Sequence, residues 1–268
     1  EIVRQFGPKV HYFRHECNQG VSAARNSGLA LAQGEVIAWL DGDDLWEPEF
    51  LATVIPLLEA NGDVDGIYTG FVHIDNAGNL LPQFGSRVVP PADLYAALVE
   101  DCFIVTPAII VRKGCFEQVG HFDPQFGICE DYDMWLRLAE EFTILGLPYP
   151  LARIRVHQGN TIRNTDAFCR FRLALTQKHF GPPEGDPREW TSEKQRAHGH
   201  AFRAAALKCI ESGLADQGWD YLEEAVSIWP SLLGRLDTFY ELAIGDQPRG
   251  YRGGVQLADV EHNGAEML

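Results

Sequence analysis

Three aspartates stand within four residues, at Asp41, Asp43 and Asp44, directly after an apolar run. In an extended segment Asp41 and Asp43 face the same way, and three carboxylates so close together repel one another unless a cation lies among them. Oxygen ligands of this kind suit Mg²⁺ or Mn²⁺, above all an ion that substrate phosphates also hold. The alternative is a polar turn in which Asp44 caps the next helix, since Asp44 and Glu47 match a capping box. Capping uses one aspartate of the three, so the metal interpretation is favoured.

A second acidic cluster, Glu130, Asp131 and Asp133, stands at the start of a predicted helix. Taken alone, its favoured interpretation is that acidic residues complement the helix dipole. The functional alternative is a general base, because a carboxylate crowded by Glu130 and Asp133 can have a pKa high enough to accept a hydroxyl proton.

Two basic residues are further candidates. Arg25 lies in the first turns of a predicted helix after Gly20, where backbone N–H groups and a guanidinium together suit a diphosphate. A surface ion pair explains Arg25 equally well. His157 follows Arg153 and Arg155 on one strand face, where it could reach a metal or a phosphate, although a lone histidine is usually a hydrogen-bonded side chain.

The elements that must position these residues alternate between strand and helix, which indicates an α/β sheet covered by helices. The apolar run Glu35–Leu40 is typical of a central strand buried on both sides. The other predicted strands or extended runs are Val10–Phe13, Gly66–Ile74, Ile104–Val111 and Ala152–His157. The predicted helices are Val21–Gln33, Pro48–Asn61, Pro90–Glu100 and Glu130–Phe142, with a turn at Asp75–Gly78.

Beyond Thr165 the pattern is helical only. A helix at Ala167–Phe180 is followed by the Pro- and Gly-rich linker Gly181–Pro187 and by amphipathic stretches at Ser192–Ser212 and Asp216–Ile228. The last two resemble one tetratricopeptide-like hairpin. Because such repeats need neighbours to bury a core, a helical extension packed on the main domain is the favoured interpretation.

Charge and composition narrow the partners and the location. Acidic residues outnumber basic ones 38 to 22, giving a net charge of −16 that repels nucleic acid. No apolar run approaches the roughly 20 residues of a membrane span, which leaves peripheral membrane association open. Six cysteines without a CxxC pair indicate reduced thiols. We expect a cytoplasmic location, with the inner face of the membrane as an alternative.

Two long motifs carry a resemblance to a known family. The segment Asn18–Pro48 closely resembles the central signature of family 2 glycosyltransferases, and Gly120–Arg137 resembles that family's second signature. The resemblance covers Val10–Asn164 and implies the GT-A fold, with a Rossmann-like nucleotide-sugar site on a mixed sheet. It divides the chain into a GT-A domain at residues 1–165 and a helical C-terminal region at 166–268 that contains the tetratricopeptide-like hairpin.

The resemblance also implies roles for donor-side residues. Asp41 and Asp43 match the family's DxD motif, with Asp41 near the nucleotide ribose and Asp43 bound to the Mn²⁺ or Mg²⁺ that bridges the diphosphate. Arg25 matches an arginine that contacts the donor nucleotide. Asp41 and His157 are the other candidate metal ligands. On the acceptor side, Asp131 matches the base that deprotonates the acceptor hydroxyl, and Glu130 helps to place the acceptor.

The implied reaction is inverting transfer of a sugar from a nucleotide-diphosphate donor, a UDP-sugar, to the hydroxyl of a carbohydrate or glycolipid acceptor. Synthesis of cell-surface polysaccharide or glycoconjugate is the expected setting. The family's nucleobase-binding segments, like Pro-x-Tyr-Asn and Asp-Asp-Gly-Ser, are missing, so we expect the first βαβ portion to be absent from residues 1–165. A metal-dependent nucleotidyl or phosphoryl transferase and a non-catalytic interaction module are the alternatives. The sequence predicts neither the sugar nor the oligomeric state.

Overall fold

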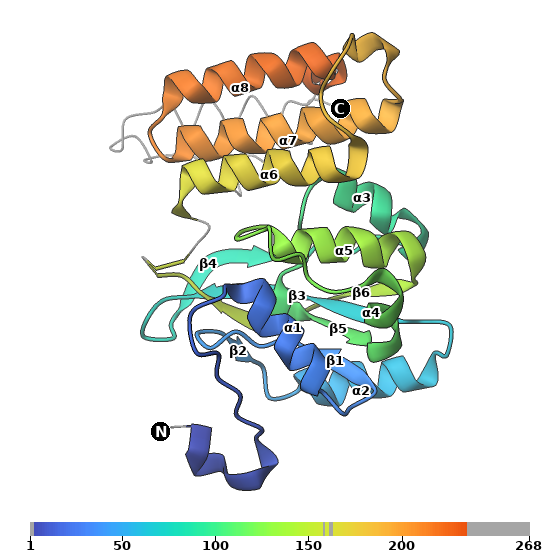
Figure 1. The fold of residues 1–268 in the computed structure, drawn as a ribbon, viewed down its shortest axis with the longest axis vertical. Helices are drawn as coiled ribbons and strands as arrows, with labels where there is room; N and C mark the ends of the chain where they lie inside the picture. The colour runs from blue at the N-terminus through green and yellow to red at the C-terminus, as the bar shows by residue number, and fades with distance from the viewer. Residues whose placement is uncertain (1–2, 158, 161–162, 235–268) are drawn as a thin grey trace, which may run out of the picture. The chain divides into compact units, whose positions relative to one another are not determined.

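The structure is a computed structural model that describes residues 3–157, 159–160 and 163–234 (Figure 1). The chain divides into two compact units, residues 1–175 and 176–268. Helix α6 (Thr165–Phe180) runs across this division. The predicted boundary between residues 165 and 166 stays a prediction.

A single mixed sheet of six strands forms the centre of the first unit. The strands are β1 Val36–Ala38, β2 Leu45–Trp46, β3 Gly66–Ile74, β4 Leu80–Gly85, β5 Ile109–Arg112 and β6 Ile144–Arg155. They lie in the order β1-β5-β3-β6-β2, and β4 pairs with β3 outside this path. The pair β3–β6 is parallel and the other pairs are antiparallel. The mixed sheet flanked by helices confirms the predicted fold class.

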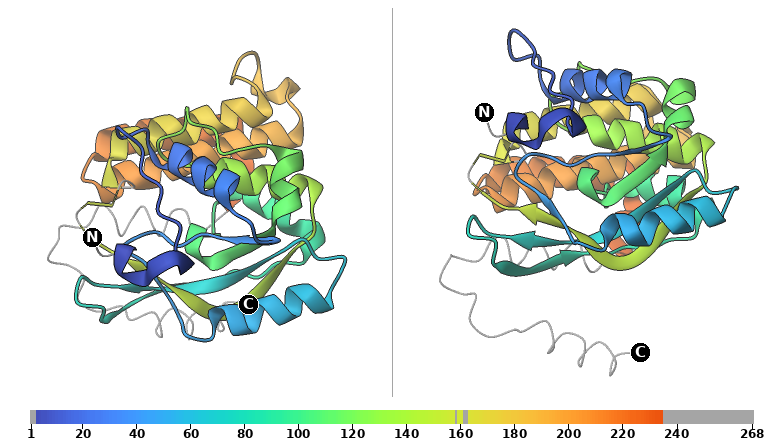
Figure 2. Two further views of the ribbon diagram at one scale, coloured as in Figure 1. Left: turned by 60° about the horizontal axis from the view of Figure 1, so that its bottom comes forward. Right: turned by 90° about the horizontal axis from the view of Figure 1, so that it is seen from below.

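Helices cover both faces of this sheet. Those of the first unit are η1 Val3–Lys9, α1 Val21–Leu31, α2 Phe50–Ala60, η2 Pro91–Asp93, α3 Leu94–Glu100, η3 Thr106–Ala108, α4 Lys113–Val119 and α5 Glu130–Glu141. Figure 2 shows α2 on one side of the sheet and α1 with α5 on the other. The candidate residues of α1 and α5 therefore belong to the same layer.

One predicted helix and one predicted strand are found close to their predicted bounds. The apolar side of α2, at Phe50, Val54 and Leu58, packs against Ile67 of β3 and Ile110 of β5. Spacing of three and four residues places these side chains on one face of the helix. The predicted strand Gly66–Ile74 is β3 with the same bounds.

Two strand predictions need correction. The run Glu35–Leu40 forms only the three-residue β1, which lies at an edge of the sheet rather than at its centre. Within the described part of the chain, β5 is the only strand that pairs with it. The run Val10–Phe13 forms no strand, and its Tyr12 and Phe13 are exposed. A β-prone run becomes a strand only where a partner strand satisfies its backbone.

The second unit is helical in its described part. It contains η5 Pro187–Glu189, α7 Ser192–Glu211, α8 Ala215–Ile228 and η6 Pro230–Gly234. Ala206 and Ile210 of α7 pack against Leu222 of α8. The helices meet closely at Gly218, where a Cβ atom would lie 2.5 Å from Cγ1 of Ile210. The predicted helical hairpin is present. None of the described helices has the length and apolar character needed to cross a membrane.

Candidate active site

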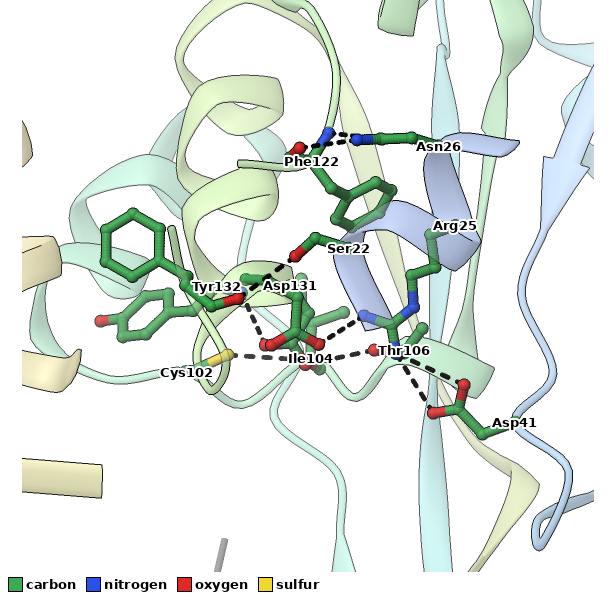
Figure 3. A network of polar contacts seen from close by, with 12 residues as sticks. Ser22, Arg25, Asn26, Asp41, Cys102, Ile104, Thr106, Phe122, Asp131 and Tyr132 are labelled. Carbon is green, nitrogen blue, oxygen red and sulfur yellow. Dashed lines mark hydrogen bonds and ion pairs between the residues drawn. The ribbon is translucent and has the colours of Figure 1, made fainter. Parts of the chain in front are cut away.

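Arg25 joins the two acidic motifs that the sequence keeps far apart. Its Nη1 donates to Oε1 of Glu130 at 2.6 Å. Its Nη2 lies 3.2 Å from Oδ2 of Asp41 (Figure 3). The Arg25 residue is only 7% exposed, so this is a buried bridge and not the surface ion pair weighed from the sequence. Its Nε is buried without a hydrogen-bond partner. Charge-assisted hydrogen bonds of this kind fix both carboxylates against one guanidinium.

Helix α1 is held against the segment before α5 by polar contacts to its backbone. The Asn26 side chain donates to the carbonyl of Phe122 at 2.8 Å and accepts from the N–H of Phe122 at 2.9 Å. The Ser22 hydroxyl donates to the carbonyl of Phe126 at 3.2 Å. Arg25 also lies over the Phe122 ring, 5.5 Å from its centroid. These contacts fix where Arg25 meets Glu130. Ser22 and Asn26 lie inside the first motif, which is the signal that sequence reasoning passed over.

The surroundings of Glu130 raise its pKa and favour its neutral form. Burial and, after it, the charge of Asp131 raise its pKa from 4.5 to about 7, although Arg25 lowers it. The residue before it, Cys129, adopts a left-handed conformation with φ 68 as α5 begins. Non-glycine residues seldom adopt this conformation, and such positions cluster at functional sites. The sequence led us to expect a raised pKa at the carboxylate between Glu130 and Asp133. In the structure, burial and a neighbouring carboxylate raise the pKa of Glu130.

Asp131 is half-buried, and each of its oxygens accepts a hydrogen bond. The Thr106 hydroxyl donates to Oδ2 at 3.1 Å, and the N–H of Tyr132 donates to Oδ1 at 2.8 Å (Figure 3). Asp133 is fully buried and its Oδ2 accepts from Arg137 at 2.8 Å. That pairing commits Asp133 to a structural role, which leaves Asp131 as the more accessible carboxylate of this cluster.

The segment Asp41–Asp44 is a turn whose three carboxylates point to three different partners. Asp41 faces Arg25, as described. Oδ2 of Asp43 lies 2.8 Å from Nε2 of His157. Oδ1 of Asp44 accepts the backbone N–H of Arg155 at 2.8 Å, so Asp44 does not cap α2, whose N-cap residue is Glu49. The capping-box alternative is therefore wrong.

Burial raises the pKa of Asp44 from 3.8 to about 6, and the charges of Asp43 and Asp41 add to this rise. The N–H of Arg155 opposes it. The Arg155 side chain then ties the turn to the β3–β4 hairpin, because Nε donates to the carbonyl of Asp43 and Nη1 to that of Asp75, at 2.8 and 2.7 Å. Arg155 thus holds the backbone of the turn.

Two side chains, Asp43 and His157, are suitable ligands for a divalent metal ion. Asp43 and His157 touch, and their side chains are 42% and 28% exposed. Among the residues that the structure describes, no group of three or more His, Cys, Asp or Glu side chains could hold an ion. One carboxylate and one imidazole facing solvent fit a Mn²⁺ or Mg²⁺ ion that also takes ligands from substrate phosphates. Asp41 is engaged by Arg25 and fits such an ion less well.

A cavity of about 620 Å³ lies beside this network, between residues 11–20 and the face of α1 that carries Ala24, Gly28 and Leu31. None of the six candidate site residues lines it. The candidate residues lie instead in the polar network around Arg25 and at the Asp41–Asp44 turn.

The structure brings the six candidate site residues into two adjoining clusters. The first is Arg25, Asp41, Glu130 and Asp131, and the second is Asp43 with His157. Residue Gly42 alone separates Asp41 from Asp43 along the chain. Thr106 and Arg155 were not predicted from the sequence. Thr106 contacts Asp131 and Arg155 contacts the Asp43 carbonyl, and neither contact is visible as a residue spacing along the chain.

Comparisons with known proteins show which family the chain resembles. Residues 1–119 match the model of glycosyl transferase family 2. An uncharacterized glycosyltransferase of Methanocaldococcus jannaschii is 27% identical over 51% of this chain and 48% of the relative. One of Rickettsia conorii is 29% identical over 69% of this chain and 33% of the relative. The chain thus spans about half or less of the length of these relatives.

A solved structure is similar in fold. The mannosyltransferase PcManGT from Pyrobaculum calidifontis, in complex with GDP-Man and Mn²⁺, has a TM-score of 0.50 and 16% identity, over 92% of this chain and 66% of that one. At this identity the likeness concerns the fold alone. The sequence match and the shared fold confirm what the two motifs predicted: this chain is similar to the family 2 glycosyltransferases.

Proposed function

We propose that the protein is a metal-dependent, inverting glycosyltransferase that moves a sugar from a nucleotide-diphosphate donor, a UDP-sugar, to an acceptor hydroxyl. The expected acceptors are carbohydrates or glycolipids used in cell-surface polysaccharide or glycoconjugate synthesis. The observation that carries the proposal is the Arg25 bridge, because one guanidinium contacts both the DxD motif and the Glu130–Asp131 motif. A two-substrate transfer needs its donor groups and its base within reach of one reacting centre.

On the donor side, the Asp41–Asp44 turn receives the nucleotide diphosphate. Asp43 and His157 would hold a Mn²⁺ or Mg²⁺ ion, which when bound supplies positive charge to the departing diphosphate. Arg25 holds Asp41, and the remaining lone pairs of the Asp41 carboxylate accept hydrogen bonds from the ribose hydroxyls. Arg25 itself is buried, its terminal nitrogens contact Glu130 and Asp41, and it positions Asp41 more than it contacts phosphate.

On the acceptor side, Asp131 accepts the proton of the acceptor hydroxyl. The acceptor oxygen then forms a bond to the anomeric carbon as the bond from that carbon to the diphosphate oxygen breaks, and the nucleoside diphosphate leaves with the electron pair. Attack from the face opposite the leaving group inverts the anomeric carbon, and a single base suffices for a single displacement. Glu130 accepts a hydrogen bond from Arg25 and thereby keeps the Arg25 side chain in place.

The test is Asp131→Asn in the whole protein, against a panel of nucleotide sugars with Mn²⁺ present. Nucleoside diphosphate release and product formation are measured together. Removing a general base typically costs about 10²- to 10⁴-fold in rate, so we expect that loss in kcat. Calorimetry should show UDP binding with Mn²⁺ within about threefold of wild type, because the base does not contact the nucleotide.

The matched control is Asp63→Asn, the same change at an exposed position in the turn before β3. It should keep full activity. An Asp131→Asn enzyme that keeps most of its rate would show that the base assignment is wrong. A wild-type protein that transfers phosphate or nucleotide in place of sugar would refute the proposed reaction.

A further inference from the structure

Thr106 makes a contact that no part of the proposed reaction yet uses. Its hydroxyl donates to Oδ2 of Asp131 at 3.1 Å, and the Thr106 residue is 4% exposed. An ionised carboxylate can only accept, so the hydroxyl must be the donor. We infer that Thr106 is a positioning residue that aims the Asp131 carboxylate at the acceptor. This inference rests on the proposed function, in which Asp131 is the base.

The backbone around Thr106 is fixed by the donor-side part of the fold. Thr106 begins η3, whose Ala108 N–H donates to the carbonyl of Val105 at 2.9 Å. The indole Nε1 of Trp46, in β2 directly after the Asp41–Asp44 turn, donates to the carbonyl of Pro107 at 2.8 Å. The hydroxyl therefore comes from a segment anchored to the donor side and reaches a carboxylate on α5.

The contact restricts the carboxylate in two ways. With Oδ1 bound by the Tyr132 N–H and Oδ2 by Thr106, rotation of the group would break a hydrogen bond to one oxygen or the other. A donor to the charged form also stabilises that form over the protonated one. Oδ2 keeps a second lone pair, because a carboxylate oxygen has about two acceptor sites. That lone pair is where the acceptor hydroxyl proton would arrive.

The charge of Asp131 raises the pKa of three described neighbours. Glu130 and Cys129 precede it on the chain, and Cys102 lies on the segment after α3. Burial raises the pKa of Cys129 to about 12 and the pKa of Cys102 well above its usual range, so both thiols stay neutral near pH 7. Thr106 is the neighbouring side chain that hydrogen-bonds to the carboxylate and favours its charge.

The experiment replaces Thr106 with valine, which keeps the side-chain shape and removes the donor. Hydrogen bonds to charged groups are worth enough to move a half-buried carboxylate by about one pH unit. We expect the acid limb of the kcat/KM profile to move up by about one pH unit, so that kcat/KM at any pH on that limb falls about tenfold. KM for the donor should not change. Thr106→Ser, which restores the hydroxyl, should return both values toward wild type.

Thr69→Val is the matched control. Thr69 is a buried threonine of β3 whose hydroxyl donates to the backbone carbonyl of Gly70 at 3.0 Å, lies 3.5 Å from that of Ala108, and does not hydrogen-bond to Asp131. It loses a hydroxyl at a comparable depth, so it reports any general effect of Thr→Val on the sheet. We expect its acid limb to coincide with that of wild type.

A second readout is independent of turnover. The ¹³C chemical shift of the Asp131 carboxyl, followed by NMR across pH, should titrate about one pH unit higher in Thr106→Val than in wild type or Thr106→Ser. An unchanged titration in Thr106→Val, or an equal change in Thr69→Val, would overturn the inference. If the titration moves but the wild-type protein turns over no nucleotide sugar, the proposed function fails while the action of Thr106 on Asp131 stands.

Discussion

Glu130 offers a test in which two physical effects predict opposite signs. Its side chain forms a 2.6 Å ion pair with Arg25, which favours the charged carboxylate, but Glu130 is only 7% exposed and lies beside Asp131, which both oppose the charge. The structure balances these effects in favour of the neutral acid, with a pKa raised to about 7. Glu130→Gln removes the titration while keeping the size of the side chain and a carbonyl oxygen for Arg25.

The magnitude follows from the size of the shift. A rise from 4.5 to about 7 corresponds to about 3 kcal/mol, at 1.36 kcal/mol per pH unit. Because the folded state holds this proton to higher pH than the unfolded state, the contribution of Glu130 is fully present below pH 4.5. It is lost as the pH rises through about 7. Wild type should therefore lose up to about 3 kcal/mol relative to Glu130→Gln between pH 4.5 and 8.

Urea unfolding of both proteins without added metal, at half-unit pH steps, measures the difference in the free energy of unfolding. Groups that do not interact with Glu130 titrate alike in the two proteins and cancel. Glu141→Gln is the matched control, because Glu141 is an exposed residue at the last position of the same helix, and its difference from wild type should stay flat. The reasoning is refuted if wild type is instead the more stable protein at pH 8 and loses that advantage toward pH 4, which is the sign expected when the ion pair dominates.

Two further predictions concern the metal ligand and the sheet. Asp43→Asn should weaken Mn²⁺-dependent UDP binding in calorimetry by about tenfold or more, since an amide holds a hard cation poorly, and leave binding in EDTA unchanged; equal affinity with Mn²⁺ would remove Asp43 as a ligand. Gly66→Ala should lower the free energy of unfolding by about 1–3 kcal/mol. Its Cβ would lie 2.8 Å from the Ile110 carbonyl oxygen, whereas Gly62→Ala, with nothing within 4 Å, should not destabilise the protein comparably.

Elements whose own residues carry a period were predictable from the sequence. The predicted helix Glu130–Phe142 is α5 at Glu130–Glu141, because its apolar residues recur at helical spacing and bury Trp135 and Leu138. The edge position of β1 was not predictable in the same way. A continuous apolar run shows that a strand is covered, but its neighbours in a sheet depend on pairing with segments far away in sequence. Val36 pairs with Arg112, which the local pattern of the run does not encode.

The candidate site was likewise predictable only in part from the sequence. Residue types and spacing favoured a metal site at Asp41 and Asp43, and the family resemblance added Asp131. They could not show that Arg25, 105 residues from Glu130, would be buried between two of the motifs. Arg25 was expected to contact the donor, and the structure surrounds it with carboxylates. Thr106 has no motif at all, since one hydroxyl at the start of a short helix gains meaning only from the carboxylate opposite it.

The bridge also explains why Asp131 suits the base role better than Glu130. Glu130 is buried and its Oε1 is occupied by Arg25, so an acceptor hydroxyl would have to displace a charged partner to reach it. Asp131 is half-buried, and its charge is among the causes that raise the pKa of Glu130. Two adjacent carboxylates whose environments differ this way divide their roles, with the buried one holding a proton and the accessible one carrying the charge. Because Oε1 of Glu130 accepts from Arg25 and the Glu130 residue is buried, the Asp131 carboxylate is the more accessible of the two to an acceptor hydroxyl.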